Sequence, residues 1–169
     1  MSSQLRVDKI VPVDGAPTGG GGGIIQIKQT FLNTATSTTT SGSFVDISGM
    51  SVSITPKFNT SKIFVMITLG SISSAAGISV GFRLLRDSTA VGNAADTTLQ
   101  SGFTNIYEGG NSSLFSASHN FLDSPATTSA ITYKLQWRNS SGTTYLNRYS
   151  GSSDSYNGSS TITAMEVSA

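Results

Sequence analysis

Residues 132–138 alternate between two kinds of side chain along their whole length. On one side of an extended chain lie Tyr133, Leu135 and Trp137, and on the other lie Thr132, Lys134, Gln136 and Arg138. A period of two residues is typical of a β-strand with one face in a core and the other in solvent. The segment therefore predicts a half-buried strand and not an amphipathic helix.

Apolar segments of similar length recur along the chain about every 10 residues, a spacing typical of all-β domains. Further strands are predicted at residues 24–31, 43–47, 51–55, 62–73, 78–87, 114–122, 143–149 and 161–167. The stretches between them, such as residues 34–42, are rich in the small polar residues, glycine and proline that favour turns. We therefore predict an all-β fold, an antiparallel β-sandwich of jelly-roll-like arrangement.

The composition excludes several classes of function. Charged residues form only 11% of the chain and the net charge is +1, so a basic stripe for nucleic acid is not expected. No apolar run is long enough to span a membrane, and the first residues do not resemble a signal peptide. Cysteine is absent, which excludes disulfides and thiolate chemistry.

Residues 62–73 differ from the half-buried pattern because apolar residues occupy both faces of the predicted strand. Ile63, Val65, Ile67 and Leu69 share one face, whereas Phe64 and Met66 share the other. A strand that is apolar on both faces is typical of the centre of a packed assembly. We therefore predict that Phe64 and Met66 contact another subunit.

Five consecutive glycines precede the first predicted strand, namely Gly19, Gly20, Gly21, Gly22 and Gly23. A phosphate-binding P-loop would need a lysine and a hydroxyl residue directly after the last glycine, but Ile24 stands there. A dinucleotide fingerprint would need a following helix, and none is expected. The run predicts a flexible hinge, or alternatively a glycine stem packed closely about a symmetry axis.

Residues 1–18 are too few to fold alone but include a strand-like apolar set. Its members are Leu5, Val7, Ile10, Val11 and Val13. An unpaired apolar strand tends to pair with another chain, which predicts an anchoring segment. The alternative is an ordinary first strand of the domain or a frayed terminus.

Catalytic patterns are weak in this chain. His119 is the only histidine, and no nucleophile-elbow motif is present, so we interpret it as a structural histidine. An alternative is that three copies of His119 meet on a trimer axis and bind an ion. We interpret the acidic residues as turn residues, in particular Asp14, Asp87, Asp96, Asp123 and Asp154. No enzymatic activity, cofactor or metal site is predicted.

Aromatic residues near the predicted loops are candidates for ligand contact. These are Tyr107, Tyr145, Tyr149 and Tyr156, with Phe103 close by. Tyrosines beside serine, asparagine and glycine form adaptable surfaces that suit glycans or proteins. The alternative for each is ordinary packing in the core.

Several phrases together resemble small tail-fibre-like or virion structural proteins of tailed bacteriophages, particularly marine phages of cyanobacteria. They lie at residues 5–30, 51–67, 82–92, 121–148 and 160–167. The resemblance implies a homotrimeric virion appendage without enzymatic activity. Its segments would be a virion anchor at 1–18, the hinge at 19–23 and a β-sandwich body at 24–169. Implied partners are further copies, other virion proteins and a host-surface glycan, with assembly in the host cytoplasm and release by lysis.

Three other functions are compatible with the same sequence. One is a head fibre or decoration (cement) protein on the capsid that recognises no receptor. A second is a lectin-like glycan-binding module whose N-terminal segment is incidental. The third is an enzyme such as a polysaccharide depolymerase, in which aspartate or glutamate would carry the chemistry.

Overall fold

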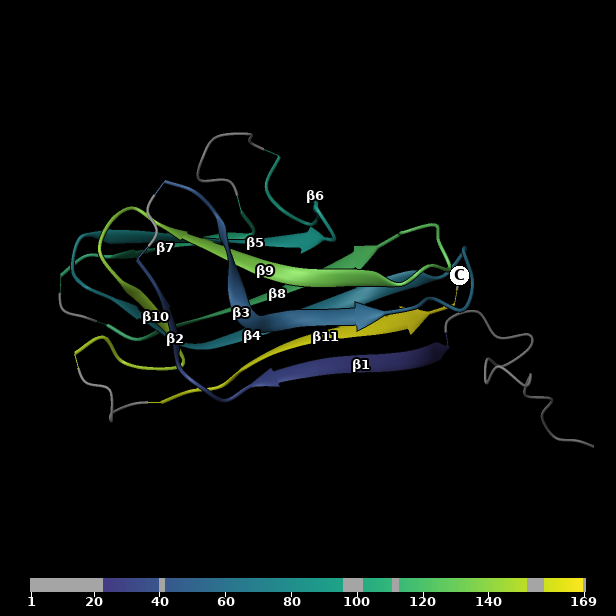
Figure 1. Ribbon diagram of the computed structural model, residues 1–169, viewed down its shortest axis with the longest axis horizontal. Coiled ribbons are helices and arrows are strands. Elements are labelled where there is room, and N and C mark those ends of the chain that lie inside the picture. Colours follow the sequence, from purple (N-terminus) through teal and green to yellow (C-terminus); the bar gives the residue numbers. More distant parts are fainter. Residues whose placement is uncertain (1–22, 40–41, 96–101, 111–112, 152–156, 169) are drawn as a thin grey trace, which may run out of the picture.

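The computed structural model describes residues 23–39, 42–95, 102–110, 113–151 and 157–168, which form eleven β-strands and no helix. These residues thus include no helix long and apolar enough to cross a membrane. The first sheet contains β1 (Ile24–Leu32), β2 (Thr36–Thr38), β4 (Lys62–Ser74), β8 (Phe115–Asp123), β10 (Thr144–Leu146) and β11 (Ser160–Val167). The second contains β3 (Val45–Ile54), β5 (Ile78–Arg86), β6 (Thr89–Ala90), β7 (Thr104–Glu108) and β9 (Ile131–Asn139). The two sheets pack as a sandwich (Figure 1).

The order of strand pairing defines a jelly roll. Eight strands form the body, and they pair as β1 with β11, β3 with β9, β4 with β8 and β5 with β7. Counted in chain order, the first of these eight strands therefore pairs with the eighth, the second with the seventh, the third with the sixth and the fourth with the fifth. This is the pairing of one long hairpin that is folded over into two sheets. Pairing of β11 with β4 joins two of these strand pairs into the first sheet, and pairing of β9 with β5 joins the other two into the second sheet. All pairs are antiparallel, which confirms the predicted all-β, jelly-roll-like sandwich.

Alternating side chains of both sheets fill the space between them. On β9 the predicted inward residues Tyr133, Leu135 and Trp137 are at most 2% exposed, which confirms the half-buried strand. They pack against Phe82 and Leu84 of β5 in one continuous core. Full burial of a large apolar side chain stabilises the fold by roughly 1.5–3 kcal/mol, so these residues hold the two sheets together.

Strand β4 has the two-sided character that the sequence predicted. Ile63, Val65, Ile67 and Leu69 are buried in the core. Phe64 and Met66 point to the opposite side, where Phe64 is half-buried and Met66 is 39% exposed. The outward direction of these two side chains is confirmed, and their contact with another subunit stays a prediction.

Several predicted element boundaries were wrong. Residues 34–42 include β2, since the β-branched threonines there pair with β10 although they also suit a loop. The predicted strands 43–47 and 51–55 are one strand, β3, whose pairing with β9 shifts between Asp46 and Ser51. The predicted strand 143–149 is reduced to β10, because Asn147 follows it with a φ of 64°, a left-handed turn conformation. The short strands β6 and β7 were missed.

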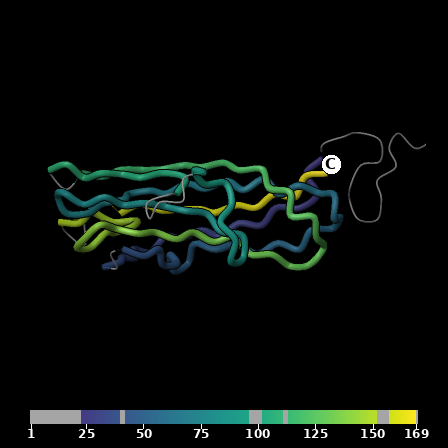
Figure 2. The backbone as a smooth tube through the Cα atoms, turned by 90° about the horizontal axis from the view of Figure 1, so that it is seen from above, coloured from purple at the N-terminus to yellow at the C-terminus, as the bar shows by residue number. Residues whose placement is uncertain are grey.

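The molecule is long and narrow, with its strands running along the long axis (Figure 2). At one end, here the base, Gly23 and Ser168 pair through two hydrogen bonds, so the first and last described residues lie side by side. At the opposite, distal end lie β2, β10 and the described parts of the connections that follow β4, β7, β9 and β10 (Figure 1). The base therefore carries the junction with the N-terminal segment, whereas the distal end carries short strands and connections.

Candidate functional site

Tyr145 lies at the distal end on β10, between β2 and β4. Its register partners are Ser37 on β2 and Ser73 on β4, so hydroxyl-bearing residues flank it on both sides. The guanidinium carbon of Arg148 lies 4.3 Å from the centre of the Tyr145 ring, a cation–π contact. Arg148 Nε donates to the backbone oxygen of Tyr149 at 3.2 Å. The structure thus places the Arg148 guanidinium against the ring of Tyr145 and the backbone of Tyr149.

Asn147 fixes the turn that carries this arginine. Its side-chain Nδ2 donates to the backbone oxygens of Leu32 at 3.0 Å and Thr34 at 3.1 Å. Its Oδ1 accepts from the Ser160 hydroxyl at 2.7 Å, and its side chain is fully buried. The turn is therefore tied to the ends of β1 and β11, which positions Tyr145 and Arg148 on a rigid support. Sequence reasoning missed Asn147, although asparagine is enriched at left-handed positions.

The remaining aromatic candidates lie apart from this pair. Tyr107 is 65% exposed on β7, in the second sheet, so it shares the distal end with Tyr145 but not its sheet. Phe103 packs inward, with its ring centre 6.4 Å from that of Phe82. Tyr156 lies outside the described residues. The structure therefore links Tyr145 to the backbone of Tyr149 through Arg148 and places Tyr107 on another sheet.

The outer face of the second sheet is charged. Arg83 lies over the Phe44 ring at 4.3 Å, and its Nε donates to Gln136 Oε1 at 2.7 Å. Gln136 and Lys134 in turn donate to the two carboxylate oxygens of Asp46. The hydrogen bond from Lys134, followed by that from Gln136, lowers the pKa of Asp46. This polar network covers β3, β9 and β5 and uses residues that the β9 alternation placed on the solvent side.

His119 on β8 packs against the segment that leads into β7. Its ring stacks on Phe103 and hydrogen-bonds to the backbone of Gly92. Its Nε2 atom is buried and has no hydrogen-bond partner among the described residues. Burial lowers the pKa of His119, partly offset by the Gly92 hydrogen bond. A structural role fits this arrangement, whereas an ion site on a trimer axis would require the ring to leave its stack.

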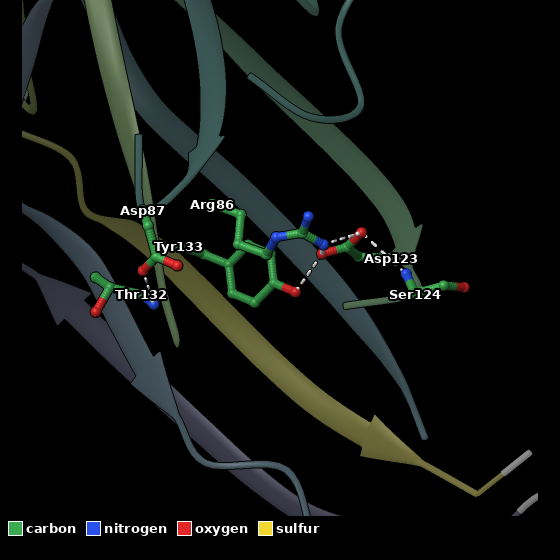
Figure 3. A network of polar contacts seen from close by, with 6 residues as sticks. All are labelled: Arg86, Asp87, Asp123, Ser124, Thr132 and Tyr133. Carbon is green, nitrogen blue, oxygen red and sulfur yellow. Dashed lines mark hydrogen bonds and ion pairs between the residues drawn. The ribbon is translucent and has the colours of Figure 1, made fainter. Parts of the chain in front are cut away.

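Asp123 ends β8 in a buried polar network near the base (Figure 3). Its Oδ2 lies 2.7 Å from Arg86 Nη1 and accepts from the Tyr133 hydroxyl at 2.6 Å. Its Oδ1 accepts from the Ser124 backbone N–H at 2.9 Å. Burial, followed by the bond to Asp123, raises the pKa of Tyr133. The interpretation of Asp123 as a simple turn residue was therefore wrong, because it joins β8 of one sheet to β5 and β9 of the other.

Asp87 does have the turn role that the sequence predicted. Its carboxylate accepts from the Thr132 backbone N–H at 2.9 Å, and its own N–H donates to Thr132 O at 2.7 Å. Asp14, Asp96 and Asp154 lie outside the described residues. Among the residues that the structure describes, no three acidic or histidine side chains are grouped so that they could hold a metal ion.

The N-terminal predictions fall almost entirely outside the described residues. This holds for the anchor residues Leu5, Val7, Ile10, Val11 and Val13 and for Gly19 to Gly22. Gly23 is described, and it extends the β1–β11 ladder: its N–H donates to Ser168 Oγ at 3.1 Å and its oxygen accepts from Ser168 N at 3.0 Å. Gly23 is therefore paired with the residue that follows β11, and the hinge at residues 19–23 stays a prediction.

Fold and surface together define a jelly-roll β-sandwich protein with one charged sheet face and a tyrosine-bearing distal end. No protein-family model matches the chain, and no curated protein sequence is significantly similar to it. A solved structure of infectious bursal disease virus, Gx strain, superimposes with a TM-score of 0.44 at 15% identity, over 96% of this chain and 44% of that one. The VP2 subviral particle of the same virus gives a TM-score of 0.41 at 12% identity, over 96% and 44%. The chain thus spans less than half the length of each of these two chains.

Proposed function

We propose that this chain is a non-enzymatic structural protein of a tailed-phage virion, a fibre or knob appendage. Residues 1–18 attach it to other virion proteins, residues 19–23 form the hinge, and residues 24–169 form the projecting body. The body assembles as a homotrimer, with Phe64 and Met66 in the subunit contact. The protein assembles in the host cytoplasm and is released with the virion by lysis.

One observation supports this proposal most directly: the N-terminal junction and the candidate tyrosines lie at opposite ends of the sandwich. Gly23, the point where the N-terminal segment joins the body, lies at the base beside Ser168. Strands β7 and β10 lie at the distal end, away from that junction (Figure 1), and they carry Tyr107 and Tyr145. A body held at its base presents such a surface outward, as an attachment protein requires. The resemblance of residues 5–30 and 121–148 to phage structural proteins supports the same assignment.

The distal end is the surface we assign to host contact. Tyr145 offers an aromatic ring, and Ser37 and Arg148 beside it offer a hydroxyl group and a cation. Aromatic rings with adjacent polar donors suit the apolar and hydroxyl faces of a sugar. Tyr149 belongs to the same cluster, and Tyr107 and Tyr156 are further candidates. Binding occurs without chemical conversion of the glycan.

Localisation on the particle tests the proposal. Gold-labelled antibody against the body should mark the virion, and label on the tail would support a fibre whereas label on the head would support a head fibre or cement protein. Purified virions on which the antibody detects no protein would contradict both locations. A full-length variant with Ile10, Val11 and Val13 replaced by serine should fold but fail to enter particles. Normal incorporation of that variant would overturn the anchor.

A lectin-like module is the second candidate function, and the Tyr145–Arg148 cluster favours it. Under this alternative, the serine variant of the N-terminal segment retains glycan binding and the protein is absent from virions. Binding of the chain to an array of bacterial surface glycans, with Tyr145→Ala as the test and Tyr107→Ala as the comparison, identifies which surface is used. If the glycan is instead degraded during incubation, the depolymerase alternative is favoured.

A further inference from the structure

The outer face of the first sheet is unusual for a single exposed surface. Residues paired across antiparallel strands point to the same side of the sheet. The register therefore places one outward row of four apolar residues across four strands, Ile27, Met165, Phe64 and Leu122. Ile27 is 54% exposed and Leu122 is 48% exposed. An apolar row that continues across four neighbouring strands is a patch and not a set of isolated exposed residues.

Two further outward rows continue this surface toward the distal end. The next row is Gln29, Thr163, Met66 and Asn120, and the one after it is Phe31, Thr161, Thr68 and Ser118. We call these twelve residues the β1–β8 face. Phe31 is 58% exposed and Met66 is 39% exposed. Half of the twelve residues are apolar, and the other half are polar without charge.

The absence of charge on the β1–β8 face contrasts with the outer face of the second sheet. That other face carries Arg83, Lys134 and Asp46 in its network. In a symmetric assembly the same patch recurs on every copy, so a charge near the axis meets its own like charge. The three rows of the β1–β8 face hold no charge that would meet its own copy, and the exposed Lys62 lies outside them, in the next row of β4 toward the base. These twelve residues are therefore suited to contact with a second copy.

The size of this surface suits the central part of an interface. Four strands spaced about 4.8 Å apart, with three outward rows about 6.8 Å apart, give a flat footprint of roughly 400 Å². The accessible area of the protruding side chains exceeds this flat footprint. The face therefore forms a large part of the roughly 800 Å² that each partner contributes to a standard protein interface.

We infer that the β1–β8 face is the surface through which copies of this chain associate. The partner is a second copy, and the interface extends beyond Phe64 and Met66 to Ile27, Leu122 and Phe31. This inference deepens the self-assembly within the proposed function and rests on it. Copies packed side by side about an axis along the strands keep all their Gly23 ends at one end, where the N-terminal segments would attach together.

A charge-insertion experiment tests the interface. Full-length chain with Leu122→Glu or Met66→Glu should associate about 100-fold more weakly in sedimentation, since a buried unpaired charge opposes contact strongly. Both side chains are partly exposed, so circular dichroism and thermal unfolding should stay close to those of the unchanged chain. Tyr107→Glu, on the second sheet, is the matched control and should associate normally. Unchanged association of both face variants, or a monomeric unchanged chain, would overturn the inference.

A second measurement identifies the occupant of the face. The chain has no cysteine, so Met66→Cys gives a single reactive thiol in the full-length protein. Its maleimide labelling should be slow at high protein concentration and fast after dilution, because dilution separates copies. Protection that persists at a dilution where sedimentation shows only monomer would show that the chain's own residues 1–22 cover the face, and would overturn the inference, as would fast labelling throughout. Tyr107→Cys should label fast at every concentration.

These outcomes are separable from those of the proposed function. If the antibody detects the chain on virions but the chain is monomeric and Met66→Cys reacts fast with maleimide, the proposed interface is overturned and the proposed function is retained. A chain that associates through the β1–β8 face but is absent from virions retains the interface and loses the function.

Discussion

His119 stacks on Phe103 with ring centres 4.6 Å apart and 9° between the ring planes. Phe103 itself leans on Phe82 of the core, so the histidine is the outermost of three packed rings. The contact joins the edge strand β8 of the first sheet to the segment that enters β7 of the second. The contact covers the side of the sandwich where β8 and β7 are the edge strands of their sheets.

The stability of the protein should fall as the pH is lowered through the titration range of His119. Because burial lowers the pKa of His119 in the fold, the unfolded chain binds a proton first, near its ordinary value of 6.5. The free energy of unfolding is therefore complete above pH 6.5 and decreases from there down to the lowered pKa. Urea unfolding at a series of pH values from 8 to 5 measures this decrease.

The variant His119→Gln is the control for that measurement. Glutamine cannot titrate, so the dependence of its unfolding free energy on pH should flatten between pH 8 and 5. Asp46, whose pKa is also lowered, loses its contribution only as the pH falls below its ordinary value of 3.8, outside this window. An equal slope in the variant and the unchanged chain would assign the effect to groups other than His119.

Asp123 should be one of the most sensitive residues for stability. Asp123→Ala removes the acceptor of three donors and leaves the Tyr133 hydroxyl buried and the Arg86 charge partly buried without their carboxylate. Breaking a buried, hydrogen-bonded ion pair costs about 3–5 kcal/mol. Since the Arg86 side chain is 25% exposed, we expect the lower end, about 3 kcal/mol, in urea unfolding at pH 7.

Two variants control the Asp123 prediction. Tyr133→Phe removes one hydrogen bond to a charged group and should cost about 1.5 kcal/mol. Asp46→Asn breaks the exposed Lys134–Asp46 pair and should change stability by less than about 1 kcal/mol. If Asp46→Asn were as damaging as Asp123→Ala, burial would not be the reason for the cost.

The sequence predicted the fold class because the core strands carry clear periodicity. The alternation at Tyr133 and Trp137 and the two-sided pattern around Val65 each reflect the faces that the strand presents in the structure. Short polar strands such as β2 carry no such signal, since threonine and serine suit both strands and loops. Strand order was also outside its reach, because pairing joins residues as distant as Ile24 and Val167.

The candidate site could be predicted only in part. Tyr145 and Tyr149 stand close in the sequence, so their grouping was local information. The separation of Tyr107 onto the other sheet, and the network that links Asp123 with Arg86, depend on which strands face each other across the core. Nothing in the residue types near Asp123 distinguishes it from a turn aspartate such as Asp87.

The Tyr145–Arg148 pair should matter for glycan binding more than for folding. Tyr145 is half-buried on the short strand β10, so Tyr145→Ser should lower stability by only about 1 kcal/mol, which is typical of single substitutions. If the distal end binds the host glycan, the same change should weaken binding about 10-fold or more, as loss of one stacked ring does. Arg148→Gln should weaken binding to an anionic glycan and leave binding to a neutral one nearly unchanged. Unaltered binding in both variants would move the site away from this cluster.

Gly102 should tolerate no side chain. It lies directly before Phe103, whose N–H donates to Phe82 O at 2.9 Å, and a Cβ on Gly102 would stand only 2.0 Å from that same oxygen. Because the obstacle is backbone of the central strand β5, Gly102→Ala must displace the segment that carries Phe103, and with it the stack on His119. We expect a loss of about 2 kcal/mol in unfolding free energy, as for overpacked cores, together with a weaker pH dependence between pH 8 and 5. Gly110→Ala is the matched control, since a Cβ there meets no atom within 4 Å, and it should be neutral or slightly stabilising. If Gly102→Ala were as stable as Gly110→Ala and kept the unchanged chain's pH dependence, the segment before β7 would not be held against β5 and β8 as described.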